Sequence, residues 1–226
     1  MHWPPEIRHK HKKGILAVDL PGHGKSTGKP EATIAAYAKV LFEFMDILGI
    51  ERAVLCGHSM GSAIAQRMSL DHPERVEGLI QIGAGAKLGV HPKLIKAASR
   101  ADTYPQAVEQ ILAWSFSQQA DQKLVRLAGK RMNELSPDIL KADFEACNNF
   151  DIRAEVAEIK QPTLIICGED DQMTPVKFSE YLAEKIRNSK LEFIPSAGHM
   201  VMLEKPEPVA RLIDDFISEL PQSRRI

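Results

Sequence analysis

A pentapeptide with the pattern G-H-S-M-G, residues 57–61, contains the residue best suited to nucleophilic chemistry. It follows an apolar run, residues 53–56, and precedes small residues with helical spacing. A serine hydroxyl is a weak nucleophile unless it stands beside a base and near amides that stabilise an oxyanion. A G-x-S-x-G turn between a strand and a helix exposes its serine, and we expect side chains at positions 57 and 61 to collide with neighbouring backbone. Ser59 is therefore the predicted nucleophile, and the backbone amide of Met60 is a predicted oxyanion donor.

A base and an acid occur later in the chain, each after an apolar run typical of a buried strand. His199 is the one histidine of eight that follows such a run late in the sequence. The run 163–167 leads into G-E-D-D-Q-M-T-P, where Asp170 and Asp171 are both candidates for the acid, although acids also suit a solvated helix N-terminus. The order Ser, Asp, His predicts a triad in which the histidine takes and returns a proton while the aspartate orients it.

A second motif, D-x-x-G-x-G-x-S at residues 19–26, precedes the pentapeptide. A phosphate-binding loop is excluded there, because that loop needs glycine where Asp19 stands. With these motifs the chain resembles, over nearly its whole length, the α/β-hydrolase fold, in the branch of esterases, lactonases, C–C hydrolases and haloperoxidase-like enzymes. The family pattern G-x-x-D-x-x-x-P favours Asp171 over Asp170. A serine nucleophile argues against the haloalkane dehalogenases and epoxide hydrolases of this fold, which use aspartate.

The elements that must position these residues alternate along the chain. Apolar runs predict buried strands at 15–20, 53–56 and 76–82, with amphipathic helices between them, and such alternation implies a parallel sheet with helices on both faces. Helix signals alone recur between residues 84 and 160, with four expected starts at Pro92, Tyr104, Asp121 and Ser136. The expected fold class is α/β: an α/β-hydrolase fold whose mostly parallel sheet lacks the first strands. Residues 1–83 and 161–226 form the predicted core, and residues 84–160 the predicted helical cap.

The resemblance also implies about three strands before Ile15, and an H-G dipeptide after the third that supplies one oxyanion amide. Only fourteen residues precede Ile15. Two compensations stay open: residues 15–20 pair directly with 53–56, or another chain covers the gap. Direct pairing would leave a sheet edge for a homodimer, and it would bring an amide of His23 or Gly24 to the site as the second oxyanion donor.

Composition excludes several classes of partner. A net charge of −1 gives no basis for binding nucleic acid or a membrane surface, and neither end of the sequence shows an apolar span of eighteen residues. The first residues lack the features of a signal peptide, so a cytoplasmic protein is expected. The three cysteines lack C-x-x-C spacing and are expected to be buried, and the basic run 8–13 is expected to be solvated. Neither a cofactor nor a metal is expected.

The function that follows is a serine hydrolase, most simply a carboxylesterase that cleaves short to medium acyl esters through an acyl-enzyme. Its partner would be a small-molecule ester, and the cap would form a mainly apolar pocket above Ser59. A lactonase or a C–C bond hydrolase is an alternative with the same residues. A non-catalytic binding or regulatory protein on this scaffold, or an incomplete fragment, is the other alternative, favoured by the missing oxyanion loop. His58, at the variable position of the pentapeptide, is interpreted as local packing.

Overall fold

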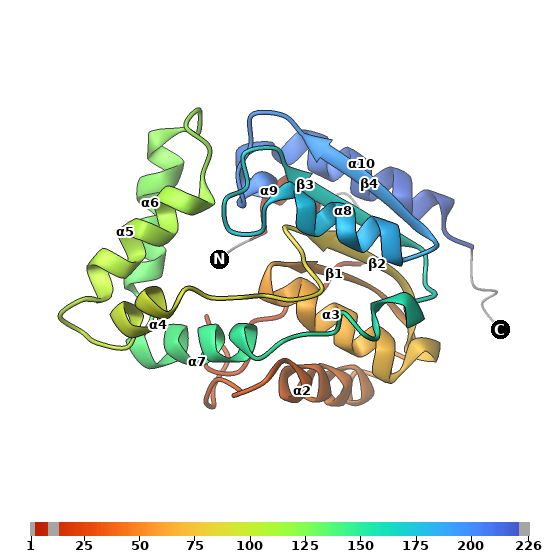
Figure 1. Ribbon diagram of the computed structural model, residues 1–226. Helices are drawn as coiled ribbons and strands as arrows, with labels where there is room; N and C mark the ends of the chain where they lie inside the picture. The colour runs from red at the N-terminus through yellow and green to blue at the C-terminus, as the bar shows by residue number, and fades with distance from the viewer. Residues whose placement is uncertain (1–2, 9–13, 222–226) are drawn as a thin grey trace.

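The computed structural model describes residues 3–8 and 14–221, and its centre is a four-stranded parallel sheet (Figure 1). The strands follow one another across the sheet in chain order: β1 (Ala53–His58), β2 (Val76–Ile82), β3 (Thr163–Gly168) and β4 (Ser189–Ile194). Each of them lies where an apolar run in the sequence predicts it. Because all four are parallel, their carboxyl ends meet at one edge of the sheet, where the predicted site residues follow β1, β3 and β4.

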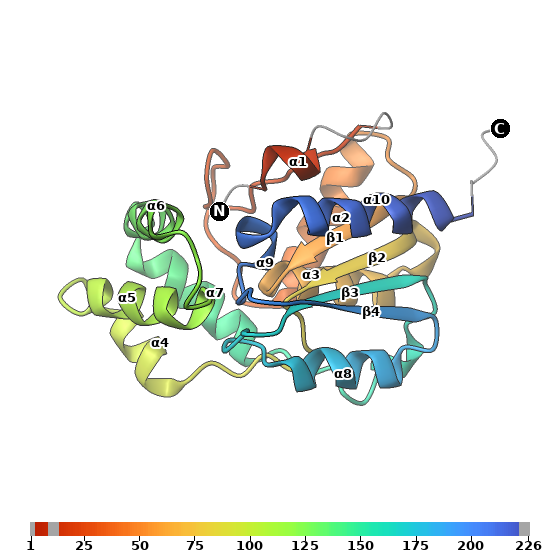
Figure 2. The same ribbon diagram turned by 90° about the horizontal axis from the view of Figure 1, so that it is seen from above.

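Helices cover both faces of the sheet, as the nearly continuous burial of β2 and β3 requires. On one face, Leu79 and Ile165 pack in a cluster with residues of α2 (Ile34–Ile47), α3 (Met60–Asp71) and α8 (Val176–Lys185). On the other face, Ile80 and Ile166 pack against α10 (Pro206–Glu219), which lies beside the short helices α1 (Pro5–Arg8) and α9 (Val201–Glu204) (Figure 2). Two 3-10 turns, Pro73–Arg75 and Val156–Glu158, precede β2 and β3.

A helical insertion lies between β2 and β3, beside the sheet in both views (Figures 1 and 2). It consists of α4 (Pro92–Ala98), α5 (Tyr104–Ser115), α6 (Gln122–Asn133) and α7 (Pro137–Asn148), so all four predicted helix starts are confirmed. Asp121 and Ser136 cap their helices with side-chain hydrogen bonds. The insertion has a small core of its own, formed by Leu94, Ala98, Tyr104, Ala107, Val108, Ile111, Met132 and Leu140.

The predicted strand at residues 15–20 is wrong. These residues form no strand, and Ile15, Leu16 and Val18 are 37%, 60% and 41% exposed. Direct pairing of this run with residues 53–56 is wrong as well, since within the described residues β1 pairs only with β2. A strand exists only where a neighbour accepts its backbone hydrogen bonds, and this run has none. Asp19 instead closes the following loop, where its carboxylate accepts from the amide of Lys25.

The exposed edge of β1 changes a second expectation. Cys56 is exposed, whereas Cys147 and Cys167 are buried as expected. Residues of an edge strand are less completely covered than those of a central strand, and among the described residues β1 has a partner strand on one side only.

The homodimer stays a prediction. Residues 9–13 of the basic run and the polar end from residue 222 lie outside the described residues. Among those described, no helix has the length and apolarity needed to cross a membrane.

Candidate active site

The nucleophile candidate Ser59 stands at the sharp turn from β1 into α3. Its backbone has φ +52° and ψ −115°, a region that side chains rarely adopt, so the turn stores strain of the kind found at functional sites. Two bonds fasten the turn to the sheet: the Ser59 amide donates to the carbonyl of Ile82 in β2 at 2.9 Å, and the Ser62 hydroxyl donates to the carbonyl of Gly57 in β1 at 2.7 Å. Within the described residues, the Ser59 hydroxyl has no hydrogen-bond partner, and catalytic hydrogen bonds are often formed only with substrate bound.

The two glycines of the turn have different roles. A Cβ atom at Gly57 would collide with the backbone of Gly61 and Ser62, so only glycine fits at position 57. A Cβ atom at Gly61 would meet nothing within 4 Å. The expectation that both positions exclude side chains is therefore wrong at position 61, because the backbone there faces open space.

The acid candidate Asp171 lies in the loop after β3 and is 5% exposed. One carboxylate oxygen accepts from the amides of Met173 and Thr174, both at 2.8 Å, and the other accepts from the Thr174 hydroxyl at 2.8 Å. Burial alone would raise the pKa of Asp171, but the hydrogen bonds from His199 and Thr174 outweigh burial and lower it. Asp171 is therefore held as a carboxylate. The rival Asp170 is exposed, and its backbone amide donates to the carbonyl of Ala197.

The base candidate His199 follows β4 and is 2% exposed. Its Nδ1 lies 2.8 Å from Oδ2 of Asp171 and 3.1 Å from Oγ1 of Thr174. Because the ionised carboxylate only accepts, Nδ1 must carry the proton, which leaves Nε2 free to accept one. The backbone of Gly83 packs against the imidazole ring of His199, since a Cβ atom at Gly83 would lie 2.9 Å from Nδ1 and Cε1 of the ring. Gly83 directly follows Ile82, whose carbonyl accepts from the Ser59 amide. Contacts through residues 82 and 83 thus connect the imidazole and the serine.

His58 makes a contact that local packing alone does not explain. Its Nε2 donates to the backbone carbonyl of His199 at 2.9 Å, and the two rings lie 4.6 Å apart. Burial, together with the neighbouring His199, lowers the pKa of His58 to about 3. His58 therefore stays neutral at physiological pH and adds no charge beside the base.

The sequence matches the model of the alpha/beta hydrolase family over residues 1–212. The chain belongs to this family. It is 27% identical to a putative carbamate hydrolase, RutD, of Caulobacter sp., over 96% of this chain and 85% of that protein. It is 26% identical to 3-oxoadipate enol-lactonase 1 of Acinetobacter baylyi, over 96% and 84%. The solved structure of a thermophilic esterase superposes with a TM-score of 0.80 at 32% identity, covering 89% of this chain and 79% of that one.

In this alpha/beta hydrolase, the oxyanion donors stay predictions. The amide of Met60, the first residue of α3, has no acceptor within the helix, and a helix N-terminus favours negative charge. The amide of His23 donates to the carbonyl of Leu20 at 2.9 Å and is therefore already engaged. The amide of Gly24 makes no hydrogen bond within the described part of the chain. Of the two candidates for the second donor, Gly24 is thus the one without an acceptor among the described residues, but the direct pairing that was expected to bring it to the site is absent there.

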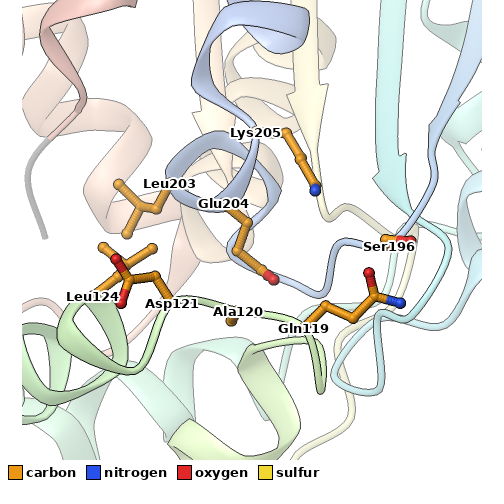
Figure 3. Close-up of a pocket in the computed structure, with 8 residues that line it drawn as sticks. All are labelled: Gln119, Ala120, Asp121, Leu124, Ser196, Leu203, Glu204 and Lys205. Carbon is orange, nitrogen blue, oxygen red and sulfur yellow. The ribbon is translucent and has the colours of Figure 1, made fainter.

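A pocket of about 340 Å³ lies where the insertion meets the core (Figure 3). Its walls are Gln119, Ala120, Asp121 and Leu124 on the insertion side, and Ser196, Leu203, Glu204 and Lys205 on the core side. None of Ser59, Asp171 and His199 lines it, so the apolar pocket expected above Ser59 stays a prediction. No cluster of three or more His, Cys, Asp or Glu side chains able to hold a metal ion occurs in residues 3–8 and 14–221.

Sequence reasoning missed three residues that contact the candidate base or the loop around it. Thr174 occupies an unspecified position of the acid motif, although aspartate side chains often accept hydrogen bonds from groups a few residues further along the chain. The sequence predicts only local packing for His58, because no pattern in it places His58 against His199. Glu204, five residues after His199, accepts from the amide of Gly198 at 2.8 Å. No sequence signal identifies that contact, because it depends on the path of the loop.

Proposed function

We propose that this alpha/beta hydrolase is a serine carboxylesterase that cleaves short to medium acyl esters through an acyl-enzyme. Ser59 attacks the ester carbonyl while Nε2 of His199 takes its proton, and the alcohol leaves with that proton. Water then enters, activated by the same nitrogen, and releases the acid. Asp171 keeps the proton on Nδ1 and stabilises the imidazolium that forms in each half of the reaction.

The observation that carries the proposal is the buried pair of His199 and Asp171. A carboxylate kept ionised at 5% exposure, 2.8 Å from an imidazole that is 2% exposed, fixes one tautomer of the base. Burying an ionised carboxylate costs stability unless hydrogen bonds offset the loss of water, and a buried carboxylate paired with an imidazole is a typical feature of functional sites. The strained turn at Ser59 is the second support: of the two described serines with positive φ, Ser59 and Ser196, Ser59 alone stands directly between a strand and a helix, the arrangement that exposes a nucleophile.

A lactone is the second substrate class that we propose for the same residues. A lactone is a cyclic ester, so attack by Ser59 gives an acyl-enzyme whose alcohol stays attached to the acyl chain. The similarity to an enol-lactonase over 96% of this chain favours this class as the alternative to open-chain esters. We propose that the helices of residues 84–160 form a cap domain on the core of residues 1–83 and 161–226, and that this cap selects the acyl chain.

The test is titration with a fluorophosphonate, in which the serine oxygen bonds to phosphorus and displaces fluoride. We expect one label per chain for the wild type, none for Ser59→Ala, and strongly slowed labelling for His199→Ala, with all three proteins folded by circular dichroism. A panel of p-nitrophenyl esters and simple lactones then ranks the two substrate classes. A folded wild type that takes no label overturns the proposal in favour of a non-catalytic binding protein on the same scaffold.

A further inference from the structure

The loop that carries His199 packs directly on the end of α5 in the helical insertion. The amide of Met200 donates to the carbonyl of Ser115 at 2.9 Å. A Cβ atom at Gly198 would lie only 2.8 Å from the carbonyl oxygen of Ser115 and from the amide nitrogen of Ser117. Two backbones from distant parts of the chain therefore touch immediately before and after the candidate base.

Glu204 joins the same two segments through its carboxylate. Oε1 accepts from the amide of Gly198 at 2.8 Å, while Oε2 accepts from the hydroxyl of Ser117 at 2.6 Å and from its amide at 3.2 Å. Ser117 is 6% exposed, so its donors depend on protein acceptors instead of on water: this carboxylate, and for the hydroxyl also the carbonyl of Ser196 at 3.5 Å. In Figure 3 the Glu204 side chain extends from α9 into the pocket between insertion and core.

We propose that Glu204 is a positioning residue for His199, and that it ties the place of the base to the helical insertion. The carboxylate fixes the peptide immediately before His199 and, with its other oxygen, fixes the first residue after the C-cap of α5. Movement of the insertion is thereby transmitted to the backbone of the base. The proposal rests on the proposed hydrolase function for its catalytic consequence, but not for the link itself.

Three donors on one carboxylate make the link specific for glutamate. A glutamine at position 204 has one oxygen and one NH₂ group. If the oxygen accepts from Gly198, the NH₂ group can donate to the Ser117 hydroxyl but leaves the Ser117 amide without an acceptor. If the side chain turns round, the Gly198 amide loses its acceptor instead. Either arrangement breaks the tie between the two segments, which pack on each other, so both lose support; a buried amide without a partner favours movement of its backbone.

The test compares E204Q with E207Q, the same substitution at an exposed position three residues later in α10. A shift of about 1 Å in a catalytic group costs on the order of 100-fold in rate, so we expect kcat of E204Q on a p-nitrophenyl ester to fall roughly 10- to 100-fold. KM should stay within about twofold, since no substrate contact is lost. The rate of fluorophosphonate labelling should fall by the same factor as kcat. E207Q should match the wild type in kcat, in KM and in the rate of labelling.

Amide hydrogen exchange of the same proteins measures how firmly Glu204 holds the two segments together, and it does not depend on catalytic activity. In E204Q we expect faster exchange in both segments, 115–118 and 196–200, and in E207Q in neither. S117A, which keeps the carboxylate and its bond to Gly198, should show the same pattern more weakly. The double variant should be no worse than E204Q, because both substitutions break one network. If E204Q does not fold, S117A alone is tested for faster exchange in both segments.

Unchanged kcat in a folded E204Q, a change in KM alone, or faster exchange in only one segment would overturn the positioning role. A wild type without labelling or turnover would instead reject the proposed function. The exchange comparison would still decide whether Glu204 links the two segments, so the two failures are distinguishable.

Discussion

The side chain of His58 donates a hydrogen bond from Nε2 to the backbone carbonyl of His199, 2.9 Å away. The residue before the proposed nucleophile thus holds the main chain of the proposed base. His58→Gln can still reach this carbonyl with an amide N–H, whereas His58→Phe fills the space without a donor. We expect His58→Phe to lower kcat about tenfold or more, since a small displacement of a catalytic group is costly, and His58→Gln to retain most of it. Steady-state kinetics of both variants check this, and equal losses would show that the ring packing matters instead of the hydrogen bond.

The acid is tested by comparing Asp171→Asn with Asp170→Asn. The Met173 and Thr174 amides donate to one oxygen of Asp171, so the carbonyl of an asparagine would take that place and its NH₂ group would face Nδ1 of His199. Nδ1 would then have to accept, which moves the proton to Nε2 and removes the base. We expect a loss of roughly 10³- to 10⁴-fold in kcat for Asp171→Asn. Asp170→Asn should be mild, because its described contact is a backbone one; the reverse order would assign the acid to Asp170.

The hydroxyl of Thr174 is tested by Thr174→Val, which has nearly the same shape. The substitution removes Oγ1, which donates to Oδ2 of Asp171 at 2.8 Å. The same oxygen lies 3.1 Å from Nδ1 of His199. The pKa of Asp171 is held down partly by Thr174, so it should rise in the variant. A carboxyl group whose pKa is lower in the folded than in the unfolded protein stabilises the fold. This stabilisation is complete at pH values above the unfolded pKa and is lost as pH falls through the folded pKa. Acid unfolding should therefore begin at higher pH in Thr174→Val, while Thr174→Ser should restore wild-type behaviour.

Gly83 sets the space for the imidazole. It has φ +54°, and a Cβ atom there would lie 2.9 Å from two atoms of the His199 ring. Gly49 is a matched control, because it has φ +66° and nothing within 4 Å of such an atom. We expect both Gly→Ala variants to lose about 1–2 kcal/mol of unfolding free energy through backbone strain. Only Gly83→Ala should also lose activity, and equal kinetics for the two variants would contradict the contact.

A fifth prediction concerns His23, whose Nε2 lies 2.8 Å from Asp143 of α7 and whose Nδ1 lies 3.0 Å from the carbonyl of Pro21. Both ring nitrogens face acceptors, and the hydrogen bond to Asp143 raises the pKa of His23 despite burial. The stabilisation of the fold by protonated His23 is then complete below the pKa of the imidazole in the unfolded protein, about 6.5. It is lost as pH rises through the higher pKa of the folded protein. We expect His23→Gln to destabilise the protein at pH 5.5 and much less at pH 9 in urea unfolding.

The matched experiment repeats His23→Gln in an Asp143→Asn background. Without the carboxylate the pH dependence of the difference should disappear. A difference that grows with pH would mean that His23 is neutral in the folded protein.

The sequence predicted those parts of the molecule that depend on local pattern. The strand, turn and helix around Ser59 follow from apolar runs and glycine spacing, and the loops with Asp171 and His199 follow from strands that end at one edge. The strand predicted at residues 15–20 is wrong, because an apolar run becomes a strand only when a neighbouring strand is present to pair with it. His58, Thr174 and Glu204 could not be found, because each acts through a contact between segments distant in sequence or through the path of a loop. Such contacts have no periodicity to read.

The strand order of the sheet, β1 to β4, is also the order in which a ribosome delivers the strands. A nascent chain that has emerged as far as Ile82 already contains β1, the turn at Ser59 and the carbonyl that holds its amide. The acid candidate, the base candidate and Glu204 all come after residue 170, and a domain generally folds as a unit. An unfinished chain that stops before residue 171 therefore carries the serine without either of the groups proposed to activate it, and its hydroxyl is inert.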